Sequence, residues 1–139
     1  MSLTRKEIAI RSALIFMGVF TTTPALAVIN PAQLESYGVI DPNSIVLTLL
    51  QHRGLLQFAL GASLVYAAFK PDIRVAAALA AIFTKGGGLL ITYSRPEVFA
   101  EASQVAMVFD PLCIVLLAAI LVDIALQRGR YAGRRPTGA

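Results

Sequence analysis

Apolar side chains fill four long runs of this sequence, and short segments rich in Pro, Asn, Asp and Ser separate them. A run of about 20 apolar residues is long enough to cross the hydrocarbon core of a bilayer as an α-helix. The four runs are 9–29, 45–69, 75–94 and 105–126. Because only the short segment 70–74 joins the second run to the third, these two helices must be antiparallel neighbours. The pattern predicts an all-α, polytopic membrane protein whose four transmembrane helices form an antiparallel bundle.

The composition strengthens this prediction. Hydrophobic residues make up 57% of the 139 residues and charged residues only 14%, whereas soluble domains carry about 25% charged residues. We expect one transmembrane domain, residues 1–127, followed by a basic cytoplasmic tail, residues 128–139. The net charge of +4 is modest and no basic run alternates with aromatic residues, so no nucleic-acid partner is expected.

Basic residues are distributed unevenly between the two ends of the runs. One set of ends carries Arg5, Lys6, Arg11, Lys70, Arg74, Arg128, Arg130, Arg134 and Arg135. Arg95 is the only Lys or Arg in the two remaining loops. Because Lys and Arg accumulate in cytoplasmic loops, we expect both termini and the 70–74 connector in the cytoplasm. Asp123, near the cytoplasmic end of the last run, is expected to pair with Arg128.

The N-terminal run also has the features of a secretory signal peptide. It has a basic start, an apolar stretch and the possible cleavage site Ala25-Leu26-Ala27. Cleavage would leave three spans and an outside N-terminus. We favour an uncleaved first helix, because four spans agree better with the distribution of basic residues.

Away from their cytoplasmic ends, the apolar runs are interrupted by four charged or titratable residues and a cluster of threonines. They are His52, Arg53, Lys85 and Asp110, with Thr22 at the centre of the threonines on the first run. At a rise of about 1.5 Å per residue, Thr22, Arg53, Lys85 and Asp110 lie roughly 8–14 Å below the outer boundary. Because an ionised side chain facing lipid costs a few kcal/mol, we expect these residues to point inward and form one polar layer in the outer half of the bilayer.

Glycines accompany this layer on two helices. Gly86, Gly87 and Gly88 follow Lys85, and Gly54 and Gly61 lie seven residues apart on the second run. Small residues let the backbones of membrane helices approach closely, so we expect helix packing at these positions.

Two interpretations of the polar layer are open. In the first, Asp110 neutralises Lys85 or Arg53 and the layer is a structural ion-pair network, which is the usual arrangement of buried charge in membrane bundles. In the second, the excess of cations over carboxylates recruits an anion, because buried net charge is unfavourable. The outer segment with Leu34, Tyr37, Val39 and Ile40 is expected to form a flap over the layer.

The remaining candidate residues point to no enzymatic chemistry. Cys113 lies among Ile and Leu and is expected to be a buried small hydrophobe. His52 has no second His, Cys or suitably placed carboxylate beside it, so no metal or cofactor is expected. A proton relay through His52 and Asp110 is an alternative, since such chains occur in pumps.

The second run, "QHRGLLQFALGASLVYA", carries Arg53-Gly54, and with the short loops and cytoplasmic termini it resembles small four-helix bacterial membrane proteins of the DoxX-like and BphX-like kind. The resemblance implies an accessory role beside larger assemblies such as lipid importers or respiratory complexes. It implies no catalytic residue.

These observations favour a non-enzymatic integral membrane protein that serves as an accessory or stabilising subunit of a larger membrane complex. Its expected partners are membrane lipids and either other membrane subunits or further copies of itself. The alternative is a small carrier or lipid-binding protein that holds an anionic ligand at Arg53 and Lys85. A third class, a quinone-linked membrane enzyme, would need a cofactor ligand that the sequence does not show.

Overall fold

The computed structural model describes residues 3–101 and 104–132, and within these ranges the chain is helical with no β-strand. The long helices are α1 (Arg5–Thr22), α2 (Ser44–Phe69), α3 (Arg74–Tyr93) and α5 (Gln104–Ala132). A short helix, α4 (Pro96–Glu101), and three 3-10 segments, η1 (Thr23–Val28), η2 (Pro31–Tyr37) and η3 (Pro71–Ile73), connect them. The predicted all-α class is confirmed.

Four helical segments are long and apolar enough to cross a membrane. They are Arg5–Val28, Ser44–Phe69, Pro71–Tyr93 and Gln104–Arg130. The structure thus contains the predicted number of helices with the length and composition needed to span a membrane. The fourth helix is longer than its predicted run, because α5 continues through residues 128–132, where we expected a separate tail. The rest of that predicted tail, residues 133–139, lies outside the described residues.

Polar side chains cap the first turns of two helices, and a proline changes the type of the first one. The Thr4 hydroxyl accepts a hydrogen bond from the Glu7 amide at the start of α1, and the Asn43 side chain accepts one from the Val46 amide at the start of α2. Such caps satisfy amides that have no partner inside the helix. Pro24 has no amide hydrogen to bond back along the chain, so regular α-helix stops at Thr22 and continues as the 3-10 segment η1.

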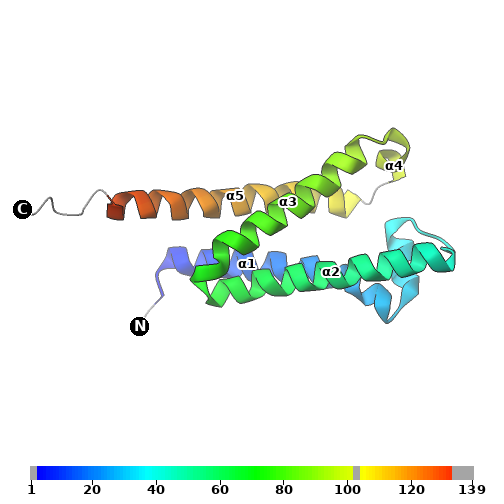
Figure 1. The fold of residues 1–139 in the computed structure, drawn as a ribbon, viewed down its shortest axis with the longest axis horizontal. Coiled ribbons are helices and arrows are strands. Elements are labelled where there is room, and N and C mark those ends of the chain that lie inside the picture. The colour runs from blue at the N-terminus through cyan, green and yellow to red at the C-terminus, as the bar shows by residue number, and fades with distance from the viewer. Residues whose placement is uncertain (1–2, 102–103, 133–139) are drawn as a thin grey trace, which may run out of the picture.

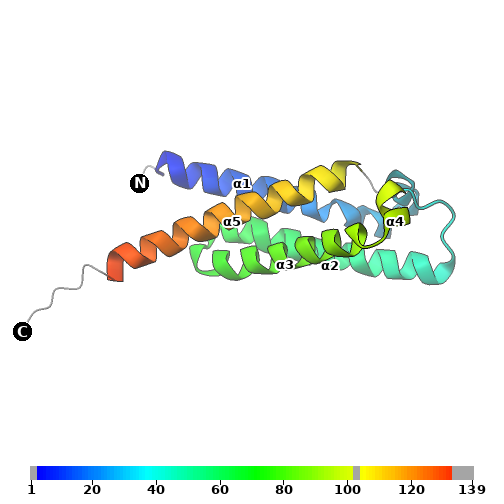
Figure 2. The same cartoon turned by 90° about the horizontal axis from the view of Figure 1, so that it is seen from above.

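The four long helices pack as two pairs. Helices α1 and α2 have the most extensive contact, α3 packs along α5, and α2 meets α3 near η3. Figures 1 and 2 show both pairs running between two ends of the molecule. We call the end with the N-terminus and η3 the η3 end, and the end with η2 and α4 the η2 end. Contact between α1 and α5 is sparse.

The first pair is held close by facing glycines. A Cβ built on Gly61 would lie 2.5 Å from the Gly18 carbonyl oxygen, and one built on Gly18 would lie 2.6 Å from the Gly61 carbonyl oxygen. No side chain larger than hydrogen fits at either position without movement of a backbone. The small-residue contact allows α1 and α2 to touch along their backbones.

A narrow apolar core runs between the pairs, and many other apolar residues face outward. The fully buried side chains include Leu14, Met17, Leu64, Cys113 and Leu117. The most exposed large hydrophobic residues include Phe83, which is 81% exposed, on α3. Apolar surface of this kind is stable in contact with acyl chains, in agreement with helices that span a bilayer.

Candidate functional site

A buried ion pair joins α3 to α5. The Lys85 ammonium donates a hydrogen bond to Asp110 Oδ1 at 2.7 Å, and Lys85 is only 6% exposed. Its Nζ also lies 4.9 Å from the centre of the Phe109 ring, where a cation is attracted by the π-electrons. Asp110 therefore supplies a counter-charge to Lys85 from within the protein, without an external anion.

A cavity of about 220 Å³ lies beside this pair, at the η2 end. It is surrounded by residues from the four long helices α1, α2, α3 and α5, from η1 and η2, and from the segment after η2. Its lining consists of Phe20, Pro24, Leu34, Tyr37, Val39, Leu50, Arg53, Gln57, Lys85, Val105, Ala106, Phe109 and Asp110. The cavity therefore brings together three of the residues that the sequence predicted for one layer, namely Arg53, Lys85 and Asp110.

Arg53 provides the charge that is not balanced inside this cavity. It lies on α2, remains exposed and forms no ion pair with any side chain in the described part of the chain. The lining contains two cations, Arg53 and Lys85, and one carboxylate, Asp110, which leaves one positive charge. The neighbouring Gly54 lets α2 lie close to η1, because a Cβ there would lie 2.7 Å from the Pro24 carbonyl oxygen.

The segment around η2 covers part of the cavity. Leu34 is buried, and Tyr37 and Val39 join it in the lining. The side-chain amide of Gln33 donates to the Thr23 carbonyl at 3.0 Å, which ties η2 to η1. Of the four residues predicted for this flap, Ile40 does not belong to it, because it is 76% exposed and absent from the lining.

His52 and Thr22 do not join the cavity lining, contrary to the expectation of a shared polar layer. His52 precedes Arg53 by one residue and therefore lies about 100° away around α2, where it is exposed. The Thr22 hydroxyl donates to the Val19 carbonyl at 2.7 Å within its own helix. Similar depth in the membrane thus does not bring these two side chains to the same site.

The glycines of the two helices also differ from one another. Gly54 and Gly61 lie against the backbone of the first helical segment, as described above. The close approach expected at the glycines after Lys85 is wrong for the described residues. The nearest atom to a Cβ on Gly86 is Ile114 Cδ1 at 3.9 Å, and no atom lies within 4 Å of one on Gly87 or Gly88. Within the described residues, Gly87 and Gly88 are therefore not packed against another helix.

Three phenylalanines continue the cavity wall toward the outside between α1 and α5. Phe20 and Phe109, which both line the cavity, have ring centres 4.4 Å apart. Phe16 lies 6.0 Å from Phe20 and 6.2 Å from Phe109, centre to centre, and is 57% exposed. We call these three residues the phenylalanine row. The spacing of Phe16 and Phe20 by four residues was the signal in the sequence for a shared helix face.

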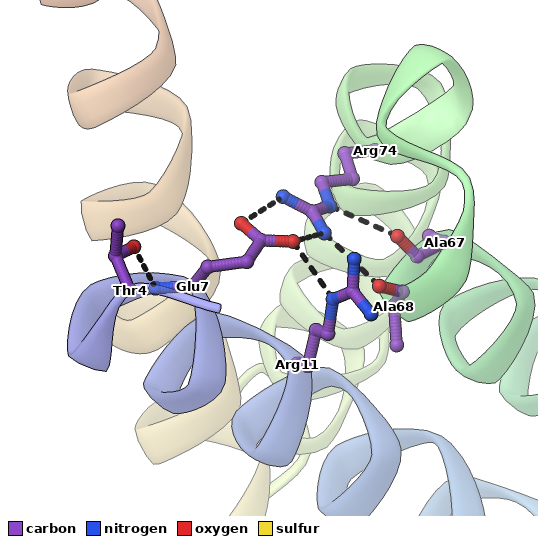
Figure 3. A network of polar contacts seen from close by, with 6 residues as sticks. All are labelled: Thr4, Glu7, Arg11, Ala67, Ala68 and Arg74. Atoms are coloured by element: carbon purple, nitrogen blue, oxygen red, sulfur yellow. Dashed lines mark hydrogen bonds and ion pairs between the residues drawn. The ribbon is translucent and has the colours of Figure 1, made fainter. Parts of the chain in front are cut away.

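A second polar network, which sequence analysis did not predict, holds the η3 end together (Figure 3). The Arg74 guanidinium donates to Glu7 Oε1 at 2.6 Å and to Glu7 Oε2 at 3.0 Å. It also donates to the Ala67 and Ala68 carbonyls, at 2.9 and 3.0 Å, near the end of α2. Arg11 Nε donates to Glu7 Oε1 at 2.8 Å. One buried arginine thereby connects α1, α2 and α3.

Also at the η3 end, the partners of Asp123 differ from the predicted Arg128. Its carboxylate accepts hydrogen bonds from Lys6 and from Gln127, and not from Arg128. The Lys6 contact links the start of α1 to the last third of α5, two helices that otherwise have little contact.

The described chain is thus all-helical, has four helices long and apolar enough to span a membrane, and contains a small cavity whose lining carries one excess positive charge. Comparison of the chain with protein-family models, with curated proteins and with solved structures finds no match.

Proposed function

We propose that this protein is a non-enzymatic binding protein of the bacterial inner membrane that holds an anionic ligand at Arg53. In this proposal the four helices form an antiparallel bundle with both termini in the cytoplasm. We also propose that the protein is related to the DoxX-like and BphX-like proteins. The basic residues at the η3 end support this orientation. The cavity then opens in the outer half of the bilayer.

The observation that carries the proposal is the charge imbalance of the cavity. Asp110 neutralises Lys85 at 2.7 Å. Arg53 lines the same cavity but forms no ion pair with a carboxylate of the described residues. An unpaired cation inside a membrane is unfavourable, and such residues normally find counter-charges or mark binding sites. An anion that enters the cavity would supply the missing charge.

The lining is suited to a carboxylate or phosphate group. A guanidinium has donors in a planar fork that matches two oxygen atoms of such a group. Gln57 and Tyr37 bring an amide and a hydroxyl to the same cavity and can complete the hydrogen bonding. Most of the other lining residues are apolar, as in typical ligand sites, where a few polar groups orient the ligand within apolar walls.

Native mass spectrometry of the protein purified in mild detergent tests this function. The wild type is expected to carry a bound anionic molecule, and Arg53→Ala is expected to lose it. Arg95→Ala removes a cation that does not line the cavity and serves as the matched control. Equal occupancy of all three proteins by anionic molecules, or none in the wild type, would reject the proposal.

A second candidate function is that of an accessory subunit in a larger membrane complex. The uncovered face of α3 favours it, because no atom lies within 4 Å of a Cβ on Gly87 or Gly88 in the described chain. Small residues on an open face allow a helix of another subunit to pack closely. The two functions are separable by substitution, because Gly87 does not line the cavity.

Co-purification distinguishes this second function. A subunit is expected to elute with a larger complex at fixed stoichiometry, and Gly87→Leu is expected to release it. Ala62→Leu adds the same side chain at an exposed position of α2 and should leave the complex intact. Elution of the wild type alone would remove this candidate and leave the binding function untouched.

A further inference from the structure

We infer that the ligand is an anionic amphiphile whose charged head lies at Arg53 and whose chain leaves the cavity along the phenylalanine row, between α1 and α5, into the bilayer. This inference rests on the proposed binding function and names the class of its ligand. It is carried by the size of the cavity, by the course of its aromatic wall and by the chemistry of its lining.

The cavity is too small to enclose a whole amphiphile. Its volume is about 220 Å³, whereas sites that enclose drug-sized molecules measure about 300–1,000 Å³. A carboxylate or phosphate head with the first part of a chain fits this space. The remainder of a chain must therefore lie outside the cavity.

The phenylalanine row offers that remainder a continuous apolar path. It begins at Phe20 and Phe109 in the cavity lining and ends at Phe16, which is 57% exposed on the outer surface of α1. The row runs between α1 and α5, the two long helices whose mutual contact is sparse. A chain can pass there without separating an extensive helix interface.

The lining also argues against a free, water-soluble anion. Phe20, Leu34, Val39, Leu50, Val105 and Phe109 all face the cavity. A small inorganic anion would satisfy Arg53 but leave these apolar surfaces against water or empty space, which gives no gain in free energy. A head group that carries its own chain satisfies both the charge and the apolar wall.

A single introduced tryptophan tests the path of the chain directly, because the sequence contains no Trp. Phe16→Trp places the fluorophore at the outer end of the row, and Phe83→Trp places a control on α3, at a side chain that is 81% exposed. The probe is a fatty acid brominated in the middle of its chain, titrated into the protein in detergent. Bromine quenches tryptophan only at short range.

The fluorescence of the Phe16→Trp variant should be quenched saturably, and adding Arg53→Ala should raise the half-saturation concentration at least tenfold. Quenching in the Phe83→Trp variant should be weak, non-saturating and unaffected by Arg53→Ala.

Native mass spectrometry of the same samples, with the brominated fatty acid and with inorganic phosphate, separates the possible failures. The amphiphile path is refuted and the binding function stands if Arg53-dependent binding occurs but Phe16→Trp is quenched no more than Phe83→Trp. The same conclusion follows if phosphate binds with the same affinity as the fatty acid. If neither probe shows Arg53-dependent binding, the proposed function fails.

Discussion

Arg74 and Glu7 form a two-pronged ion pair, with nitrogen–oxygen distances of 2.6 and 3.0 Å, across 67 residues of sequence. The same guanidinium donates to two carbonyls near the end of α2. These carbonyls are orphan acceptors, because a helix has no amides of its own beyond its last turn. The buried arginine thus satisfies groups from three helices at the η3 end.

Arg74→Lys should destabilise the protein by about 2 kcal/mol, because an ammonium cannot reproduce the planar fork and leaves buried acceptors unpaired. Arg11→Lys is the matched control, since Arg11 makes only one bond to Glu7 and is less buried. Reversible unfolding in mixed micelles measures both. Equal losses in the two variants would show that the fork has no special role.

Gly61→Ala should cost about 1–3 kcal/mol, as overpacked cores do. The new methyl group would meet the Gly18 carbonyl oxygen and Thr22 Cγ2, each at 2.5 Å, so α1 and α2 must move apart. Gly87→Ala meets no neighbour and should leave the stability unchanged or raise it by up to about 1 kcal/mol. The same unfolding measurement gives both values, and a stable Gly61→Ala variant would contradict the close glycine contact.

Asp110→Asn should destabilise the fold by about 3 kcal/mol, the lower end for a broken buried ion pair, because Asp110 itself is 28% exposed. The loss arises because the buried Lys85 side chain would be left without its carboxylate partner. The double variant Lys85→Met/Asp110→Leu removes both charges and should recover most of the stability. A double variant no more stable than Asp110→Asn would argue against the pair as the source of the loss.

The proposed orientation can be mapped with single cysteines in a Cys113→Ala background. A membrane-impermeant maleimide should label Glu35→Cys on η2 in intact cells and label Asp72→Cys on η3 only after permeabilisation. The prediction follows from the accumulation of Lys and Arg at the η3 end. Labelling in the reverse order would place the cavity on the cytoplasmic side.

The long apolar runs predicted the helices well, because crossing a bilayer sets a minimum length and hydrophobicity that few other structures require. The runs did not predict where the helices end. Those ends depend on local groups such as the Thr4 cap and the proline that changes α1 into η1. The helix after residue 127 likewise has no apolar signal that marks its continuation.

The sequence predicted how far along the helices the site residues lie, but not on which face of its helix each residue lies. Counting residues along a helix placed Arg53, Lys85 and Asp110 at one level, and all three line the cavity. The same counting admitted His52 and Thr22, which lie at a similar depth and face elsewhere. Which residue faces a neighbour depends on how helices rotate against each other, and contacts such as Gly61 against Gly18 determine that.

The network around Arg74 shows a different limit. Along the sequence, its arginines indicate only the cytoplasmic side, because the distribution of Lys and Arg treats each cation as an isolated charge. The spacing of Glu7 and Arg11 by four residues indicates a pair on one helix face. The bond from Glu7 to Arg74 depends on tertiary packing, and nothing in the local sequence indicates it.

Titration of a long-chain fatty acid into the detergent-purified protein tests the central claim most directly, that Arg53 supplies the unbalanced charge of the cavity while Asp110 neutralises Lys85. Arg53→Ala should weaken the affinity at least tenfold, which corresponds to the loss of about 1.4 kcal/mol or more from a charge-assisted contact. The folded double variant Lys85→Met/Asp110→Leu should bind within about threefold of the wild type, a change of less than about 1 kcal/mol. Wild-type affinity in Arg53→Ala, or a larger loss in the double variant than in Arg53→Ala, would contradict the account.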